Sequence, residues 1–211
     1  ADAILLNRID ELPAEELDEL SELVLQRYPG VPLLKVSART GQGFDSVLAL
    51  LDQEGDFGRK ILDIDYDVYA EGEAELGWLN SSVHVQAPSP FEVDALMLEI
   101  IQGLRDSLVR QQAEVAHLKV IGLAEGGFGV ANLVSSLTQP ELSLPSHQKL
   151  TETDVIVNAR VAMDPAQLEV EVQRVVKQAS VRRGGQAEFR KTQSLRPGRP
   201  TPTHRYASAV K

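Results

Sequence analysis

The sequence predicts a mixed α/β chain in two parts. Residues 1–53 have the pattern of the carboxyl-terminal part of a doubly wound, parallel-sheet domain, because two short apolar strands flank one amphipathic helix and a second helix follows. Residues 81–179 predict a small α+β domain in the order β-α-β-β-β-α, which is typical of an antiparallel sheet with two helices on one face. A connecting strand and linker at 54–80 and a basic, disordered tail at 180–211 complete the expected organisation.

The first part opens on an unbroken apolar run, Ala3 to Leu6, which favours a strand buried on both faces of a parallel sheet. A helix is predicted over 13–26, since Pro13 suits the first turn and acidic residues crowd the amino end, where the helix dipole favours them. The second strand is predicted at 32–36, and a second helix follows the glycine-rich loop after it. The inward stripe of the first helix should comprise Leu17, Leu20, Leu23 and Val24.

The second part follows the same rules of periodicity. Strict alternation at 61–69 predicts a half-buried strand ahead of it. The sequence Ser89-Pro90-Phe91-Glu92 predicts a capping box at the start of a long helix. Asp164 and Pro165 begin the last helix, whereas 139–148, with two prolines, predicts a loop. Strands are expected at 81–87, 117–124, 128–135 and 153–163.

The composition is that of an ordinary globular protein. The 211 residues are 43% hydrophobic and 25% charged. There is no Cys, which excludes disulfides, thiolate metal ligands and a thiol nucleophile. No segment resembles a signal peptide or an apolar membrane span, so we expect a cytoplasmic protein without a membrane partner.

The charge is unevenly distributed along the chain. The net charge is −10, but residues 181–211 hold eight basic residues and one acidic residue, a net +7, which leaves −17 for the rest. An acidic body does not favour nucleic acid as a partner. The basic tail is expected either to stay solvated or to dock on an acidic partner or on the acidic body itself.

The clearest candidate binding motif lies at the end of the first predicted strand. Asn7 and Asp10 follow it in the pattern Asn-x-x-Asp, at the carboxyl end, where parallel sheets bind ligands. A guanine edge offers a ring N–H and an exocyclic amine side by side, and one ionised carboxylate can accept both. Adenine would leave the Asp10 carboxylate unpaired. Asn7 would steady the loop and contact the other purine edge, and the stem of Arg8 would cover the base.

A second motif follows the second strand. Ser37-Ala38-Arg39 leads into a loop with two glycines, and the distance from the first motif suits one crossover helix. A backbone N–H near Ala38 would face the guanine carbonyl oxygen.

Together these motifs resemble those of the CobW-type GTPases, a branch of the SIMIBI class of P-loop GTPases and metal chaperones. The stretches ADAILLNRIDEL and VSARTGQGFDSV carry the resemblance, with Arg8 where Lys is usual. The resemblance implies guanine contacts by Asn7, Arg8, Asp10, Ser37 and Ala38. It further implies GTP as ligand, Mg²⁺ and a transition metal such as zinc or cobalt in the full-length protein, and a client metalloprotein or cofactor-assembly protein, including those of cobalamin biosynthesis.

The phosphate-binding half of such a site is missing from the sequence. No Gly-x-x-x-x-Gly-Lys-Ser/Thr occurs, so we expect a fragment that retains the guanine-recognition motifs and is inactive alone in GTP hydrolysis. No catalytic residue is assigned. The alternative is a non-enzymatic protein-interaction module that uses the 81–179 domain.

Other candidate chemistry is weak. Three Asp at alternate positions of 63–67 and four unclustered histidines do not favour a metal site, because a metal needs several converging ligands. We therefore expect no metal ligands in this chain. The histidines are His84, His117, His147 and His204.

Overall fold

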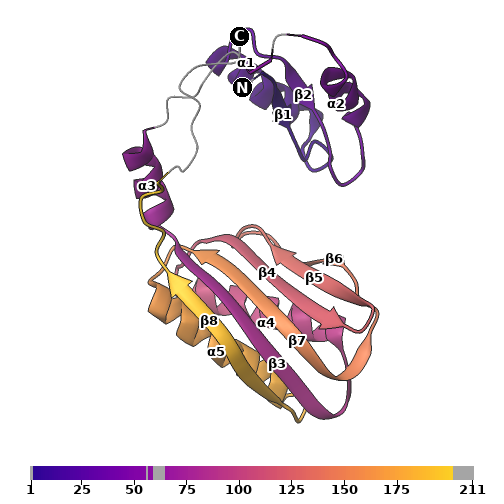
Figure 1. Ribbon diagram of the computed structural model, residues 1–211, viewed down its shortest axis with the longest axis vertical. Helices are drawn as coiled ribbons and strands as arrows, with labels where there is room; N and C mark the ends of the chain where they lie inside the picture. The colour runs from indigo at the N-terminus through magenta and orange to yellow at the C-terminus, as the bar shows by residue number, and fades with distance from the viewer. Residues whose placement is uncertain (1, 56, 59–64, 202–211) are drawn as a thin grey trace. The chain divides into compact units, whose positions relative to one another are not determined.

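The computed structural model describes residues 2–55, 57–58 and 65–201 (Figure 1). The described chain divides into a first unit within residues 1–64 and a second unit over 65–200. Each unit has its own helices and strands.

The first unit contains two strands and two helices. They are β1 (Ile4–Leu6), α1 (Ala14–Arg27), β2 (Leu33–Lys35) and α2 (Phe44–Leu51). β1 and β2 pair in parallel, with Ile4 opposite Leu33 and Leu6 opposite Lys35. The predicted order and the parallel crossover are therefore confirmed, and the two strand ends lie at the same edge.

Burial in this unit differs from the prediction. The first strand is not buried on both faces, because Leu5 is 47% exposed. In α1, Leu20 and Leu23 are exposed as well, and the buried residue is instead Ser21. Two strands and two helices are too few, among the described residues, to cover both faces of a sheet.

The second unit is larger and contains nearly all of the buried apolar residues. Its elements are α3 (Tyr66–Ala74), β3 (Gly77–Glu92), α4 (Val93–Arg110), β4 (Val115–Ala124), β5 (Gly127–Leu133), β6 (Glu141–Leu144), β7 (Lys149–Val161), α5 (Pro165–Val181) and β8 (Gln186–Leu195). The six strands form one sheet in the order β6-β5-β4-β7-β3-β8, and all of its pairs are antiparallel.

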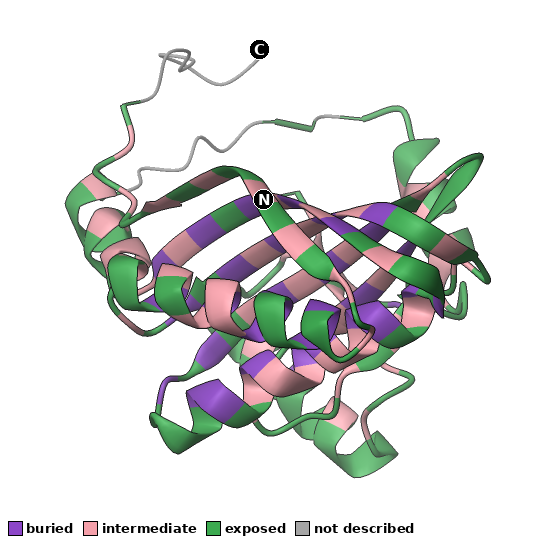
Figure 2. Ribbon diagram, turned by 90° about the horizontal axis from the view of Figure 1, so that it is seen from below, coloured by how far each residue is buried: buried purple, intermediate pink, exposed green. Residues whose placement is uncertain are grey.

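Helices α4 and α5 cover one face of this sheet, as predicted (Figure 2). Along β3, the buried residues Leu79, Ser81, Val83 and Val85 alternate with more exposed ones, which is the pattern of a strand with one packed face. They pack with α4 residues such as Leu96 and Ile100, which are fully buried. The other face carries no helix in the described part of the second unit.

Two segments that were predicted to be irregular are strands. Residues 186–195, predicted to be part of a disordered tail, form edge strand β8 and pair with Trp78–Gln86 of β3. Residues 141–144, predicted to be loop, form β6 beside β5.

One predicted strand and one predicted helix start are also wrong. The described part of the strand predicted at 61–69 is helical, because α3 begins at Tyr66 and Asp65 caps it by accepting from the backbone N–H groups of Asp67 and Val68. The remainder, 61–64, lies outside the described residues. The predicted capping box is strand instead, since β3 continues to Glu92 and α4 starts at Val93 without a side-chain cap.

The first residues beyond β8 contact acidic and carbonyl groups of α3. Arg196 Nη1 donates to the carbonyl of Ala74 at 2.5 Å, and Arg199 Nε donates to Asp67 Oδ1 at 2.5 Å. This part of the basic segment therefore docks on the acidic body. Among the described helices, none has the length and apolar character needed to cross a membrane.

Candidate functional site

The carboxyl ends of β1 and β2 are held together by backbone hydrogen bonds. The Val36 N–H donates to the Leu6 carbonyl at 2.8 Å, and the Ile9 N–H donates to the Val36 carbonyl at 3.3 Å. The chain that leaves β1 thus continues alongside the end of β2. Residues 7–10 and the start of the 37–43 loop become neighbours.

Side chains then tie the two motifs to each other. Asn7 Oδ1 accepts the Ala38 backbone N–H at 2.9 Å. The pKa of Asp10 lies below its ordinary value, chiefly because the Ser37 side chain donates a hydrogen bond to it, with smaller contributions from Arg39 and Arg8. Asp10 is exposed, whereas Ser37 is fully buried. The structure therefore brings Asn7, Asp10, Ser37 and Ala38 together and leaves an ionised carboxylate facing solvent.

Hydrogen bonds close the 37–43 loop on itself. Ser37 Oγ accepts the Thr40 N–H at 3.1 Å, and the Ser37 N–H donates to the Gln42 carbonyl at 2.9 Å. Gly43 has a φ of +77° and begins α2 so close to β2 that a Cβ there would lie 2.1 Å from the Lys35 carbonyl oxygen. Only glycine fits both restrictions, so this residue fixes the loop against β2.

Arg8 adopts a conformation that the sequence does not reveal. Its φ is +68°, in the left-handed region, and its Nε donates to Glu11 Oε2 at 2.7 Å. The side chain is 55% exposed. Paired with Glu11, Arg8 does not take the position that was predicted for its stem, over the face of a base. To cover a base, the Arg8 side chain would have to turn away from Glu11.

The Ala38 N–H is likewise occupied. The Asn7 oxygen accepts it, so a guanine carbonyl would have to share this donor or displace that oxygen. The contacts of a purine with the five predicted residues remain predictions.

No group of three or more His, Cys, Asp or Glu side chains in the described residues is arranged to hold a metal ion. His84, His117 and His147 come from three separate segments of the second unit. Asp67 pairs with Arg199. Asp63 and His204 lie outside the described residues.

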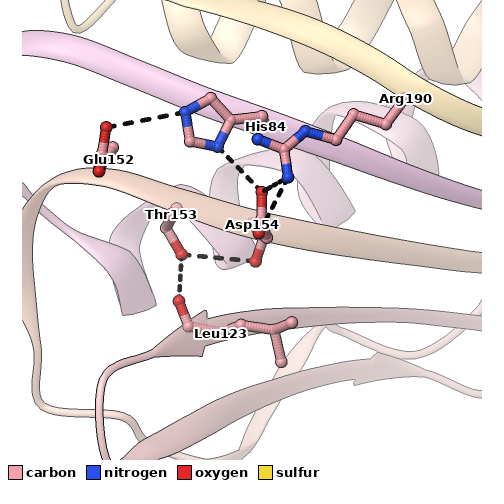
Figure 3. A network of polar contacts seen from close by, with 6 residues as sticks. All are labelled: His84, Leu123, Glu152, Thr153, Asp154 and Arg190. Atoms are coloured by element: carbon pink, nitrogen blue, oxygen red, sulfur yellow. Dashed lines mark hydrogen bonds and ion pairs between the residues drawn. The ribbon is translucent and has the colours of Figure 1, made fainter.

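A polar network that sequence reasoning missed lies on the helix-free face of the large sheet (Figure 3). His84 Nδ1 lies 2.9 Å from Asp154 Oδ1, and its Nε2 lies 3.8 Å from Glu152 Oε2. Arg190 Nη1 lies 3.2 Å from the same Asp154 oxygen. Thus polar contacts join β8, β3 and β7 across this face, and the sequence signal was the run of polar residues at alternate positions of β3 from Asn80 to Gln86.

A hollow of about 370 Å³ lies on the same face, nearer the amino end of β3. Its floor is formed by β3, β4 and β7, and β8 forms one side. The lining residues are Trp78, Leu79, Asn80, His117, Lys119, Asn158, Ala159, Arg160, Gln193 and Leu195.

Comparison of the chain with protein-family models, with curated proteins and with solved structures gives no significant match.

Proposed function

We propose that the carboxyl ends of β1 and β2 recognise the guanine base of GTP, in a cytoplasmic, CobW-like GTP-binding protein. In such a protein, GTP binding is coupled to delivery of a transition metal, such as zinc or cobalt, to a client metalloprotein or to a cofactor-assembly protein such as one of cobalamin biosynthesis. One observation carries the proposal: Asn7, Asp10, Ser37 and Ala38, from two motifs separated by a helix, converge at one edge of the parallel pair.

The chemistry of Asp10 fits a guanine edge. Its carboxylate is exposed and favours the ionised state because Ser37 donates to it. An ionised carboxylate fixed in place can accept the ring N–H and the exocyclic amine of guanine together, and such charge-assisted pairs are the strong ones. Asn7 Oδ1 accepts the Ala38 N–H and Ser37 Oγ accepts the Thr40 N–H, so the loop that follows β2 is positioned before a ligand arrives.

Hydrolysis of GTP is assigned to no residue of this chain. Mg²⁺, the phosphate cradle and the water-positioning group supply that chemistry, and the chain contains no Gly-x-x-x-x-Gly-Lys-Ser/Thr motif. The proposal for the described residues is therefore base recognition.

The test compares three nucleotides in the complete gene product. GTP, ITP, which lacks the exocyclic amine, and ATP are titrated under identical Mg²⁺ and salt. Loss of one hydrogen bond to a charged group should weaken ITP by about tenfold or more relative to GTP, and ATP should bind more weakly still. Equal affinities for all three nucleotides would refute recognition by Asp10.

A second candidate is a non-enzymatic protein-interaction module. It is favoured by the helix-free face of the six-stranded sheet in the second unit, which presents polar side chains such as Asn80, His84 and Asn158. In that case the complete gene product has no guanine-nucleotide affinity, and partner capture survives deletion of residues 1–53.

A further inference from the structure

The hollow on the helix-free face gathers positive charge in an otherwise acidic protein. Arg160 lies on the central strand β7, and its register partners are Trp78 on β3 and His117 on β4. Lys119 comes from β4, two residues after His117. All four side chains face away from the helices, since the residues between them in each strand, such as Leu118 and Ala159, are buried in the core.

No carboxylate lines this hollow. Within the described residues, neither Arg160 nor Lys119 forms an ion pair with an acidic side chain. The whole chain has a net charge of −10, and most of its other basic groups on this unit are paired, for example Arg190 with Asp154 and Arg183 with Glu99. Two cations left unpaired side by side repel each other unless an anion joins them.

The geometry of Arg160 is suited to an oxyanion. Its guanidinium lies 3.9 Å from the centre of the Trp78 ring, so stacking fixes its plane. A fixed guanidinium presents paired N–H groups that match carboxylate or phosphate oxygens, and little side-chain freedom remains to be lost on binding. The Trp78 indole N–H itself is buried and has no partner among the described residues.

Neutral polar groups complete the lining. Asn80 Nδ2 donates to Asn158 Oδ1 at 2.7 Å, so the two amides hold each other on the floor of the hollow. Burial, followed by the charges of Lys119 and Arg160, lowers the pKa of His117 below its ordinary value. The imidazole is therefore neutral near pH 7 and is available as a hydrogen-bonding group beside the two cations.

We propose that this hollow binds a small organic or inorganic anion through a phosphate or carboxylate group, with Arg160 and Lys119 as the charged contacts. A volume of about 370 Å³ is within the range of small-molecule sites. The site lies wholly in the second unit, so it does not depend on guanine recognition by the first.

The single Trp of the chain makes the test direct. Because Trp78 lines the hollow, its fluorescence should change when an anion reaches Arg160. Methyl phosphate and succinate are titrated separately into the full chain, at constant ionic strength held with chloride, and calorimetry measures the same binding without relying on Trp78. A saturable response to either anion supports the site, and the one that responds identifies phosphate or carboxylate as the preferred group.

Three variants separate a site from a general surface charge. Lys119→Gln and Arg160→Gln should each weaken anion binding by about tenfold or more, as expected for loss of a charge-assisted contact. Lys191→Gln is the matched control, because Lys191 pairs in register with Ser82 and does not line the hollow. It should change the affinity less than about twofold.

Two results would overturn the proposal. One is the absence of saturable binding of either anion to the wild-type chain by calorimetry. The other is equal weakening by Lys191→Gln and Lys119→Gln. Thermal unfolding of each variant confirms that it is folded, and the two hollow variants give independent tests if one of them is not.

Discussion

Ser37 is the residue on which the proposed base site depends. It is fully buried, its Oγ accepts from the Thr40 N–H, and its side chain donates to Asp10. Ser37 thus connects the loop that follows β2 with Asp10, the proposed base-recognising residue that follows β1.

Gly43 gives a prediction about the backbone of the same loop. Gly43→Ala should destabilise the first unit by about 1–3 kcal/mol more than Gly41→Ala does. At Gly43 the overpacking of the added Cβ adds to the conformational strain that both positions share. Both residues have a φ near +80°, but an added Cβ at Gly41 meets no atom within 4 Å, whereas at Gly43 it meets the Lys35 carbonyl. Hydrogen exchange of the β2 and α2 amides in urea measures the difference. Equal effects of the two substitutions would show that the clash is relieved.

Asp94 gives a prediction about pH. Burial raises the pKa of this carboxyl, but hydrogen bonds from the Ser146 side chain and from the Ser146 and His147 backbone outweigh it, so the pKa lies below its ordinary 3.8. A lowered pKa in the folded state stabilises the protein above the ordinary value, and this stabilisation is lost as the pH falls through the lowered one.

Asp94→Asn should therefore destabilise the second unit by about 1–3 kcal/mol at pH 7. The difference in the free energy of unfolding between Asp94→Asn and the wild type should shrink as the pH falls below 3.8. Urea unfolding followed by Trp78 fluorescence measures it. Asp106→Asn, on the same helix, is the control with an exposed carboxyl, and a difference that grows toward acid pH would contradict the assignment.

At the scale of elements, β8 is a strand that the sequence pattern did not reveal. Its inward residues are Ala187, Phe189, Thr192 and Ser194. The register shifts between Ser82 and Val83 of β3, so Arg190 is an extra residue in β8 and the period of two is broken at that point. Two of the inward residues are also polar, so neither alternation nor hydrophobicity identified the strand.

A substitution in β8 tests its contribution to the sheet. Phe189 packs on the core, and Lys177 Nζ lies 5.7 Å from the centre of its ring. Phe189→Ala should destabilise the second unit by about 2–4 kcal/mol, somewhat less than at a fully buried site. Gln193→Ala, on the exposed side of the same strand, should change the free energy of unfolding by less than about 0.5 kcal/mol. An unchanged free energy of unfolding in Phe189→Ala would indicate that β8 adds little to the stability of the second unit.

The start of α4 shows a second local ambiguity. Ser89 and Pro90 have the sequence of a helix amino terminus, yet they lie in β3, where the pairing with β7 is interrupted between Gln86 and Phe91. Proline is tolerated in a strand at such an interruption, because no ladder N–H is needed there. Burial of Phe91 in the core then decides in favour of the strand.

At the scale of the whole molecule, the sequence predicts those features of the fold that follow from the local spacing of apolar residues. The order of strands and helices in the first unit and the two helices on one face in the second depend on apolar spacing, and both were predicted. Convergence of Asn7 and Asp10 with Ser37 and Ala38 was also predictable, since neighbouring parallel strands end at one edge. The hollow was not, because it depends on the pairing of β3, β4 and β7, which are far apart in the chain.

The proposed function depends on guanine recognition by Asp10, and an Asp10→Asn substitution in the complete gene product tests it most directly. An amide offers one donor and one acceptor, which suits xanthine, whose ring has a carbonyl where guanine has its amine. Titration with GTP and XTP should show GTP weakened by about tenfold or more and XTP strengthened. An unchanged affinity for GTP would contradict the assignment.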